Sequence, residues 1–140
     1  MEICCGEYLF TDDKSKIHLE EVCHLLRQSH WAQERPVEII GKSIEGSLCF
    51  SVFHQDVQIG FARVVTDYAV YSLILDVIID NEYRGKGLGK KLVDFMIDHP
   101  DIKDTSFALW TKYAEGLYDK CGFQEESGYI YMFKRPERGV

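Results

Sequence analysis

Apolar and polar positions follow two different periods along this chain, and the two periods separate strands from helices. Alternating or continuous apolar runs predict strands at residues 3–10, 48–54, 57–67, 71–79 and 106–110, with two shorter ones near residues 123–125 and 129–133. Helical spacing predicts helices at residues 17–29, 37–44, 88–99 and around 114–121. The predicted order is β-α-α-β-β-β-α-β-α-β-β, which describes a mixed α/β chain.

Prolines and polar pairs support these boundaries. Pro36 opens the second helix, where its missing N–H costs nothing, and Pro100 stops the third. Gln55 and Asp56 join two strands as a hairpin. The strand at residues 71–79 is nearly apolar throughout, as expected for the buried centre of a sheet. Asp76 is the one carboxylate in it.

A glycine-rich segment connects this central strand to the third helix. It reads Tyr83-Arg84-Gly85-Lys86-Gly87-Leu88-Gly89. A helix start leaves backbone N–H groups unpaired and carries the positive end of the helix dipole. Glycines let an anion approach those groups closely, and two basic side chains add positive charge. The order strand, glycine turn and helix therefore predicts a phosphate-binding loop.

The glycine spacing fits neither a P-loop nor the G-x-G-x-x-G dinucleotide motif. It resembles motif A of the GNAT acyltransferases, R/Q-x-x-G-x-G/A, which reads here Arg84-x-x-Gly87-x-Gly89. About thirty residues later, the stretch from Ala114 to Phe123 resembles motif B of the same family, A-x-x-L-Y-x-K-x-G-F. The resemblance spans most of the chain between residues 53 and 133. It implies one GNAT domain over residues 1–140, with a mixed central sheet of about seven strands and about four helices.

The resemblance also implies where acetyl-CoA binds, as co-substrate and without a metal. The implied pyrophosphate site is the loop Arg84, Gly85, Lys86, Gly87, Leu88 and Gly89. The implied pantetheine contacts are backbone groups of Val77, Ile78 and Ile79. An N–H near Ile78 would polarise the thioester carbonyl. Many relatives carry an asparagine three residues before the motif B alanine, and here that position is Thr111, which puts the corresponding contact in doubt.

One candidate catalytic residue follows from the same resemblance, and a second follows from its place in the apolar central strand. Tyr118 matches the phenol that protonates the leaving thiolate in many relatives; the alternative is a tyrosine that only packs. Asp76 is the candidate general base, because a buried carboxylate is expected to have a raised pKa. It would equally suit anchoring a cationic substrate or pairing with a basic residue in the sheet, and water is the other candidate base.

The composition of the chain favours some classes of binding partner over others. Sixteen basic and twenty-three acidic residues give a net charge of −7, which disfavours nucleic acid and favours a cationic acceptor such as a small amine. Five cysteines without a C-x-x-C pair argue against a disulfide framework or zinc site. No signal peptide or membrane-length apolar run is evident, so a cytoplasmic protein without membrane contact is expected. The chain is compatible with a homodimer.

The resemblance thus implies an N-acetyltransferase of the acyltransferase class that moves an acetyl group to a primary amine by direct attack on the thioester. Aromatic residues suited to the acceptor pocket are Trp31, Tyr68, Tyr71 and Tyr129, although each is also an ordinary packing residue. Two alternatives remain open at this point: a non-catalytic module that binds acyl-CoA, and an acetyltransferase that acts on a protein amine.

Overall fold

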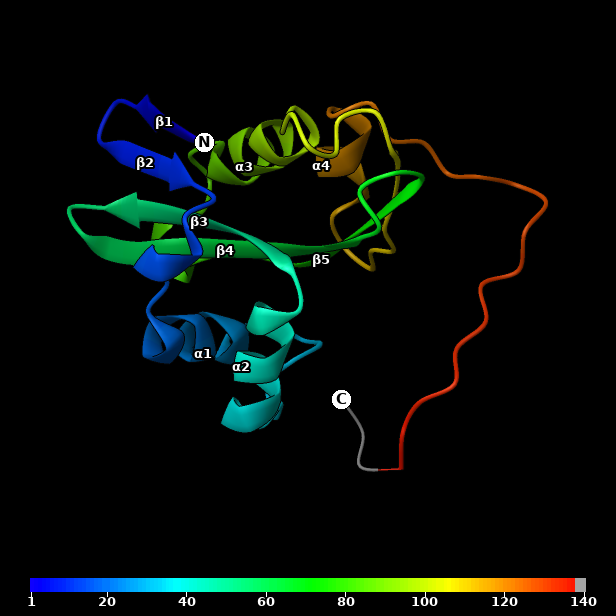
Figure 1. Ribbon diagram of the computed structural model, residues 1–140, viewed down its shortest axis with the longest axis horizontal. Helices are drawn as coiled ribbons and strands as arrows, with labels where there is room; N and C mark the ends of the chain where they lie inside the picture. The colour runs from blue at the N-terminus through cyan, green and yellow to red at the C-terminus, as the bar shows by residue number, and fades with distance from the viewer. Residues whose placement is uncertain (138–140) are drawn as a thin grey trace.

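The computed structural model describes residues 1–137 as a six-stranded sheet with helices on both faces (Figure 1). The elements are β1 (Glu2–Cys5), β2 (Tyr8–Thr11), α1 (Leu19–Arg27), α2 (Val37–Glu45), β3 (Leu48–His54), β4 (Val57–Thr66), β5 (Tyr71–Ile79), α3 (Leu88–Ile97), β6 (Ser106–Ala108) and α4 (Glu115–Asp119). Single 3-10 turns cover Lys14–Lys16 and Asn81–Tyr83. No helix in this part of the chain has the length and hydropathy needed to cross a membrane.

The strands lie in the order β1-β2-β3-β4-β5-β6. Neighbours from β1 to β5 are antiparallel, and only β5 and β6 are parallel. Helices α1 and α2 cover one face of the sheet, while α3 and α4 lie on the other (Figure 1). Each face has its own apolar core. Leu92 and Met96 of α3 belong to the first core, and Leu25 of α1 and Ile40 of α2 belong to the second.

A bulge in β5 sends its side chains to both cores. Ile74 packs in the core under α3, whereas Ile78 packs in the core under α1 and α2, although the two differ by an even number of residues. Strict alternation would place both on one face. The β4–β5 register shifts between Phe61 and Arg63, and Asp76 has a left-handed backbone with φ of 56°. The extra residue in β5 at this point reverses which face of the sheet the following side chains point to.

The sequence prediction is wrong at both ends of the sheet. Residues 3–10 form two strands rather than one, because Gly6, with φ of 61°, turns the chain into a β1–β2 hairpin. Residues 123–125 and 129–133 form no strand. They belong to a segment that runs away from the body (Figure 1). One strand gained and two lost give six strands in place of about seven.

Candidate active site

Strands β5 and β6 pair over a short ladder only, and this leaves the rest of the β5 edge without a strand partner among the described residues. The parallel ladder pairs Tyr71 to Leu73 with Ser106 to Ala108 and then ends. The rest of β5, up to Ile79, has a partner only on its β4 side within the described chain. Ile78 and Ile79 bury their side chains, so their backbone is what they can offer to a ligand. Val77 lies on the same stretch and packs against the core under α3.

The glycine loop lies at the end of this open stretch. Gly85 and Gly87 have φ of 82° and 77°, and a Cβ built at either position meets no atom within 4 Å. The loop is therefore a hollow at the start of α3 that glycine keeps open. Lys91 N–H donates to the carbonyl of Gly87, but no N–H from residue 85 to residue 90 donates to an acceptor within residues 1–137. These free donors fit an anionic group such as pyrophosphate.

Contacts at its start hold this loop in place. The Tyr83 hydroxyl lies 2.9 Å from Nδ1 of His54 on β3, and Asp80 N–H donates to the Ile59 carbonyl at 2.8 Å. Nε of Arg84 donates to the Ile79 carbonyl at 3.1 Å, which draws the guanidinium back over the end of β5. Lys86 is exposed and free to move toward a ligand. The fold thus fixes the loop backbone and leaves one cation mobile.

Gly89 has a packing role that the sequence did not reveal. A Cβ at Gly89 would lie 3.0 Å from Cδ1 of Leu117 on α4. The missing side chain lets α3 and α4 approach closely. Leu117 directly precedes Tyr118, so motif A and motif B touch at this point. The helix that carries the candidate acid is therefore positioned by the helix that carries the candidate phosphate loop.

Tyr118 has the protonation state that an acid needs. Burial, with a smaller effect from Cys121, raises the pKa of Tyr118 to about 12. Its ring packs edge-on against Phe123 with centroids 5.8 Å apart. The hydroxyl donates to no acceptor within residues 1–137, which leaves it available to a ligand. Cys121 is not an activated nucleophile, because burial and the carboxylate of Asp94 raise its pKa.

Thr111 is already engaged with its own loop. Its Oγ1 accepts a hydrogen bond from Ala114 N–H at 3.0 Å and shapes the turn that begins α4. The hydroxyl hydrogen remains available, so Thr111 can still donate to a ligand. An asparagine side chain has separate donor and acceptor atoms, and Thr111 does not provide this pair of atoms.

Asp76 lies in a buried network of ion pairs. Its Oδ2 accepts from Nε of Arg63 at 2.6 Å and from Nη1 of Arg35 at 2.8 Å. Its Oδ1 accepts from Nε1 of Trp31 at 2.9 Å. Burial would raise the pKa of Asp76, but the two guanidiniums outweigh burial and lower it below the ordinary value. The raised pKa expected from the sequence is therefore wrong, and the pairing alternative describes this carboxylate.

The sequence reasoning missed both arginines of this network. Arg63 lies between buried Ala62 and Val64 in an apolar strand, and such a charge needs a buried partner. Asp76 is the carboxylate on the neighbouring strand, so this pairing signal was present in the sequence. Arg35 gave no such signal, because it lies in the irregular segment before α2. Its Nε is the one buried side-chain polar atom without a partner among the described residues.

The four aromatic residues expected in an acceptor pocket do not gather. Trp31 is bonded to Asp76, Tyr68 and Tyr71 are exposed around the β4–β5 turn, and Tyr129 lies in the C-terminal segment. A different aromatic row is present instead. The His30 ring lies 5.0 Å from the Trp31 ring and 5.0 Å from the Tyr113 ring, between centroids. This row joins the α1–α2 connection to the loop before α4.

Known proteins are similar to this chain in sequence and in fold. Residues 45–125 match the family model of the acetyltransferase (GNAT) domain. A solved GNAT-family structure from Xanthomonas campestris pv. campestris has a TM-score of 0.85 and 31% sequence identity, and the likeness covers 94% of this chain and 96% of that one.

Two curated relatives come from Arabidopsis thaliana. GCN5-related N-acetyltransferase 2, chloroplastic, is 49% identical over 83 residues, which is 56% of this chain and 32% of that protein. Glucosamine 6-phosphate N-acetyltransferase is 38% identical over 56 residues, which is 39% of this chain and 38% of that protein. The chain thus spans well under half the length of these relatives. The family model covers more than half of the chain, and the chain belongs to the GNAT acetyltransferase family.

Proposed function

We propose that this chain is an acetyl-CoA-dependent N-acetyltransferase that acts on a primary amine. The observation that carries the proposal is the hollow loop at residues 85–90. Its N–H groups are unpaired, Gly85 and Gly87 have positive φ, and the loop lies beside the edge of β5 that has no strand partner. Gly89 and Leu117 bring the helix of Tyr118 to the same place.

In this proposal the chain binds acetyl-CoA along two surfaces. The N–H groups of residues 85–90 and the Lys86 ammonium hold the pyrophosphate, because several donors and a positive charge converge there. The β5 edge at Val77, Ile78 and Ile79 pairs with the pantetheine amides. An N–H near Ile78 polarises the thioester carbonyl. Thr111 contributes its hydroxyl hydrogen in place of the amide that many relatives use.

The amine nitrogen forms a bond to the acetyl carbon as the carbon–sulfur bond breaks. The electron pair leaves on sulfur, and Tyr118 donates its proton there. A phenol with a pKa of about 12 stays protonated at neutral pH, and water restores its proton afterwards. Most of the rate acceleration in such a site comes from holding the two reactants in the correct geometry.

Water is our proposed acceptor for the proton that the amine loses. Both oxygens of Asp76 already accept hydrogen bonds, and its lowered pKa makes it a weak base. Asp76 instead holds the bulge of β5 and the α1–α2 connection together through Arg63, Arg35 and Trp31. It is a positioning residue in this mechanism.

For the acceptor we propose a small molecule with a cationic amine, supported by the net charge of −7. Asp76 adds no attraction for a cation, because Arg35 and Arg63 compensate its charge. The row of Trp31, His30 and Tyr113 offers aromatic faces that suit an ammonium group. One relative is named for glucosamine 6-phosphate, so amino sugars belong in the first set of trial acceptors.

The test is release of free thiol from acetyl-CoA in the presence of polyamines, amino sugars, amino acids and a peptide with a free N-terminus. We expect turnover with a small amine and binding of CoA by calorimetry. Turnover with the peptide alone would favour the protein amine as acceptor. Tight CoA binding without turnover for any amine would favour the non-catalytic module, and absence of CoA binding would contradict the whole proposal.

A further inference from the structure

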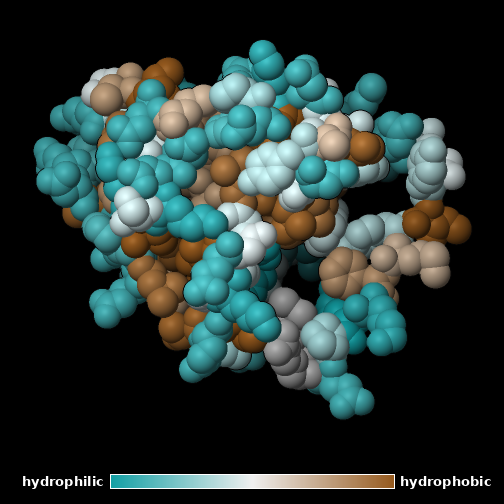
Figure 2. All heavy atoms as spheres, in the orientation of Figure 1, coloured by the Kyte–Doolittle hydropathy of each residue, from teal (hydrophilic) through white to brown (hydrophobic). Residues whose placement is uncertain are grey.

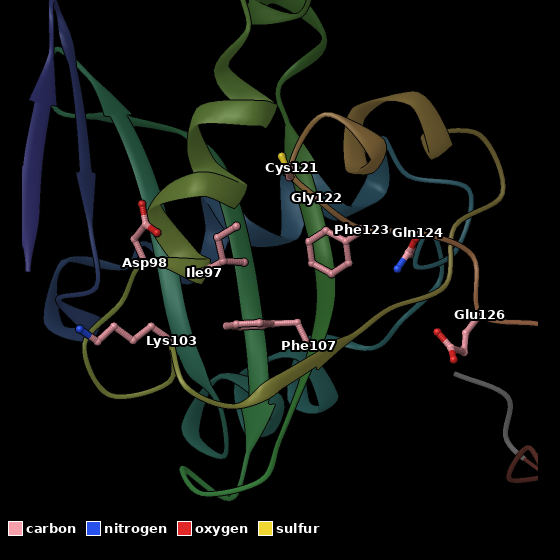
Figure 3. Close-up of a pocket in the computed structure, with 9 residues that line it drawn as sticks. All are labelled: Ile97, Asp98, Lys103, Phe107, Cys121, Gly122, Phe123, Gln124 and Glu126. Carbon is pink, nitrogen blue, oxygen red and sulfur yellow. The ribbon is translucent and has the colours of Figure 1, made fainter.

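Charged side chains that water reaches need no partner within the chain. Hydrophilic residues cover much of the face that Figure 2 shows, and solvent compensates their charges. The cavity of about 430 Å³ at the end of α3 is similar, because the charged residues that line it, Asp98, Lys103 and Glu126, are exposed (Figure 3). Neither place therefore contains a charge that requires a ligand.

The network around Asp76 is different, because it is enclosed and its charges do not cancel. The side chains of Arg35, Arg63 and Asp76 are 7%, 14% and 3% exposed. Within residues 1–137 both arginines form their ion pair with Asp76, and neither has a second carboxylate partner. Two positive charges against one negative charge leave an excess of one. An enclosed excess charge is unfavourable unless a counter-charge compensates it.

Arg35 also has a free binding edge. Its Nη1 donates to Asp76 at 2.8 Å, which leaves Nε and Nη2 on the other side of the guanidinium. Nε is buried and lacks a partner among the described residues. Nη2 also donates to no acceptor in residues 1–137, but it is not enclosed, so solvent reaches it. Nε and Nη2 form the fork with which arginine binds a carboxylate or phosphate through two parallel hydrogen bonds.

The contacts of this network lead to both parts of the proposed reaction site. Asp76 directly precedes residues 77–79, whose backbone edge is the proposed site of the pantetheine. Trp31 donates to Asp76 and begins the aromatic row that leads to the loop before α4. The candidate acid, Tyr118, lies on α4. An acceptor that binds between the aromatic row and β5 would therefore meet the Arg35 edge with another part of the same molecule.

We propose that the acceptor carries an anionic group in addition to its amine, and that Arg35 binds that group. The inference rests on the proposed N-acetyltransferase function and deepens it, because it names the acceptor class as amines that also contain a carboxylate or a phosphate. The anionic oxygens accept from Nη2 at the free edge of Arg35, and their charge cancels the excess that Arg63 and Arg35 create. With the anionic end held there and the ammonium at the aromatic row, the amine is oriented toward the thioester.

The fluorescence of Trp31 tests the anion site without any need for turnover. Trp31 and Trp110 are the two tryptophans of the chain, so Trp110→Phe leaves Trp31 as the sole indole. Titration of this variant with inorganic phosphate and with acetate should change its emission saturably for at least one anion. Adding Arg35→Gln should weaken that binding by about tenfold or more, as expected for loss of a hydrogen bond to a charged group. Lys42→Gln removes the same charge from an exposed site on α2 and should leave the binding unchanged.

Arg35→Gln should remain folded, because it leaves Asp76 and Arg63 as a balanced pair. Circular dichroism and urea unfolding verify this before the titration. The absence of a saturable change with either anion in the parent background would overturn the inference, and this result does not depend on the variant. Equal anion affinity with and without Arg35→Gln would also overturn it, because the anion would then bind elsewhere.

Matched acceptors test the same site during turnover. An amino acid is compared with its carboxamide, and an amino sugar phosphate with the free amino sugar. We expect kcat/KM to be about tenfold higher or more for the anionic member of at least one pair, and this gap to shrink in Arg35→Gln but not in Lys42→Gln. The pair with the larger gap identifies carboxylate or phosphate as the preferred group.

Failure of this inference is distinguishable from failure of the proposed function. Equal kcat/KM for both members of both pairs would overturn the anion site and leave the N-acetyltransferase function intact. If no amine is turned over, the proposed function fails, and the fluorescence titration still decides whether Arg35 binds an anion.

Discussion

Nε of Arg63 on β4 lies 2.6 Å from Oδ2 of Asp76 across the bulge of β5. The Asp76 side chain is buried, at 3% exposure, the Arg63 side chain is partly buried, at 14%, and Arg35 approaches the same oxygen at 2.8 Å. Removing one partner of such a group leaves an uncompensated buried charge. This carboxylate therefore contributes mainly to stability, and its effect on catalysis acts through the shape of β5.

Asp76→Asn should destabilise the chain by about 3 to 5 kcal/mol at neutral pH, because two guanidiniums lose their counter-charge. The folded pKa of Asp76 is lowered, so its contribution is complete above the unfolded pKa of about 3.9 and is lost as pH falls through the folded value. Urea unfolding at pH 7 and at pH 3 measures this. The gap between parent and variant should shrink at the lower pH.

The activity of Asp76→Asn distinguishes the two candidate bases. If water accepts the proton, the midpoint of the pH dependence of kcat/KM is the same in the variant and in the parent, even if kcat/KM itself is lower in the variant. If the parent shows a loss of kcat/KM at acidic pH that is absent in folded Asp76→Asn, the carboxylate of Asp76 would be the general base. Steady-state rates from pH 5 to pH 9 provide the comparison.

Gly87→Val should abolish CoA binding, because the branched side chain fills the hollow where the phosphates are expected. The positive φ of 77° also strains a β-branched residue, by about 1 to 3 kcal/mol. Gly6→Val is the matched control, since Gly6 has φ of 61° and open space but lies in the remote β1–β2 turn. Calorimetry with CoA should show binding in the control only. Equal affinity for CoA in both variants would show that the loop is not part of the CoA-binding site.

Tyr118→Phe keeps the ring against Phe123 and deletes the proton donor. If the phenol protonates the leaving sulfur, kcat should fall by about 10²- to 10⁴-fold while KM for acetyl-CoA changes little. Initial rates with saturating amine decide this, and a loss below about threefold would assign Tyr118 to packing.

The raised pKa of Tyr118 also predicts the alkaline behaviour of the parent. An acid with a pKa of about 12 stays protonated through pH 10, so kcat should not decline between pH 8 and pH 10 through this group. An alkaline limb near pH 10 that vanishes in Tyr118→Phe would show that the phenol is less shielded than the structure indicates. Acetyl transfer followed at saturating amine gives the profile.

Gly89→Ala tests the contact between the two motifs. Alanine favours the helix by about 0.5 to 1 kcal/mol, but its Cβ would lie 3.0 Å from Cδ1 of Leu117 and push that side chain aside, next to Tyr118. We expect kcat to fall several-fold without loss of stability, and Leu117→Ala in the same chain to restore part of it. Gly41→Ala in α2, where the nearest side-chain atom is 4.0 Å away, is the control and should leave kcat unchanged.

The sequence predicted the elements whose pattern is local. Residues 48–54 and 71–79 form β3 and β5 with the predicted bounds, because continuous apolar runs between clear turn signals leave few alternatives. The order of strand, glycine turn and helix pointed to the glycine loop for a similar reason, since the chemistry of such a loop depends on adjacent residues.

Features that depend on distant partners were not predicted. The network of Arg35 and Arg63 around Asp76 depends on a bulge, and a bulge changes which residues share a face without a strong local signal. The closeness of Gly89 and Leu117 is set by helix packing. Residues 129–133 have the composition of a buried strand and were predicted as one, but they form no strand in the structure.

The short ladder between β5 and β6 predicts that the two parts of the chain that it joins differ in local stability. Strands β1 to β5 each pair with their neighbour in sequence, whereas β6 joins after a crossover and through three residue pairs. Segments held by few backbone hydrogen bonds open at lower free energy than the rest of a domain. Amide hydrogens in β6 and α4 should therefore exchange with solvent before those of β3 to β5. A ligand that touches both the loop of residues 85–90 and α4 would slow that exchange. Ligand binding and the local opening of β6 and α4 are then thermodynamically coupled.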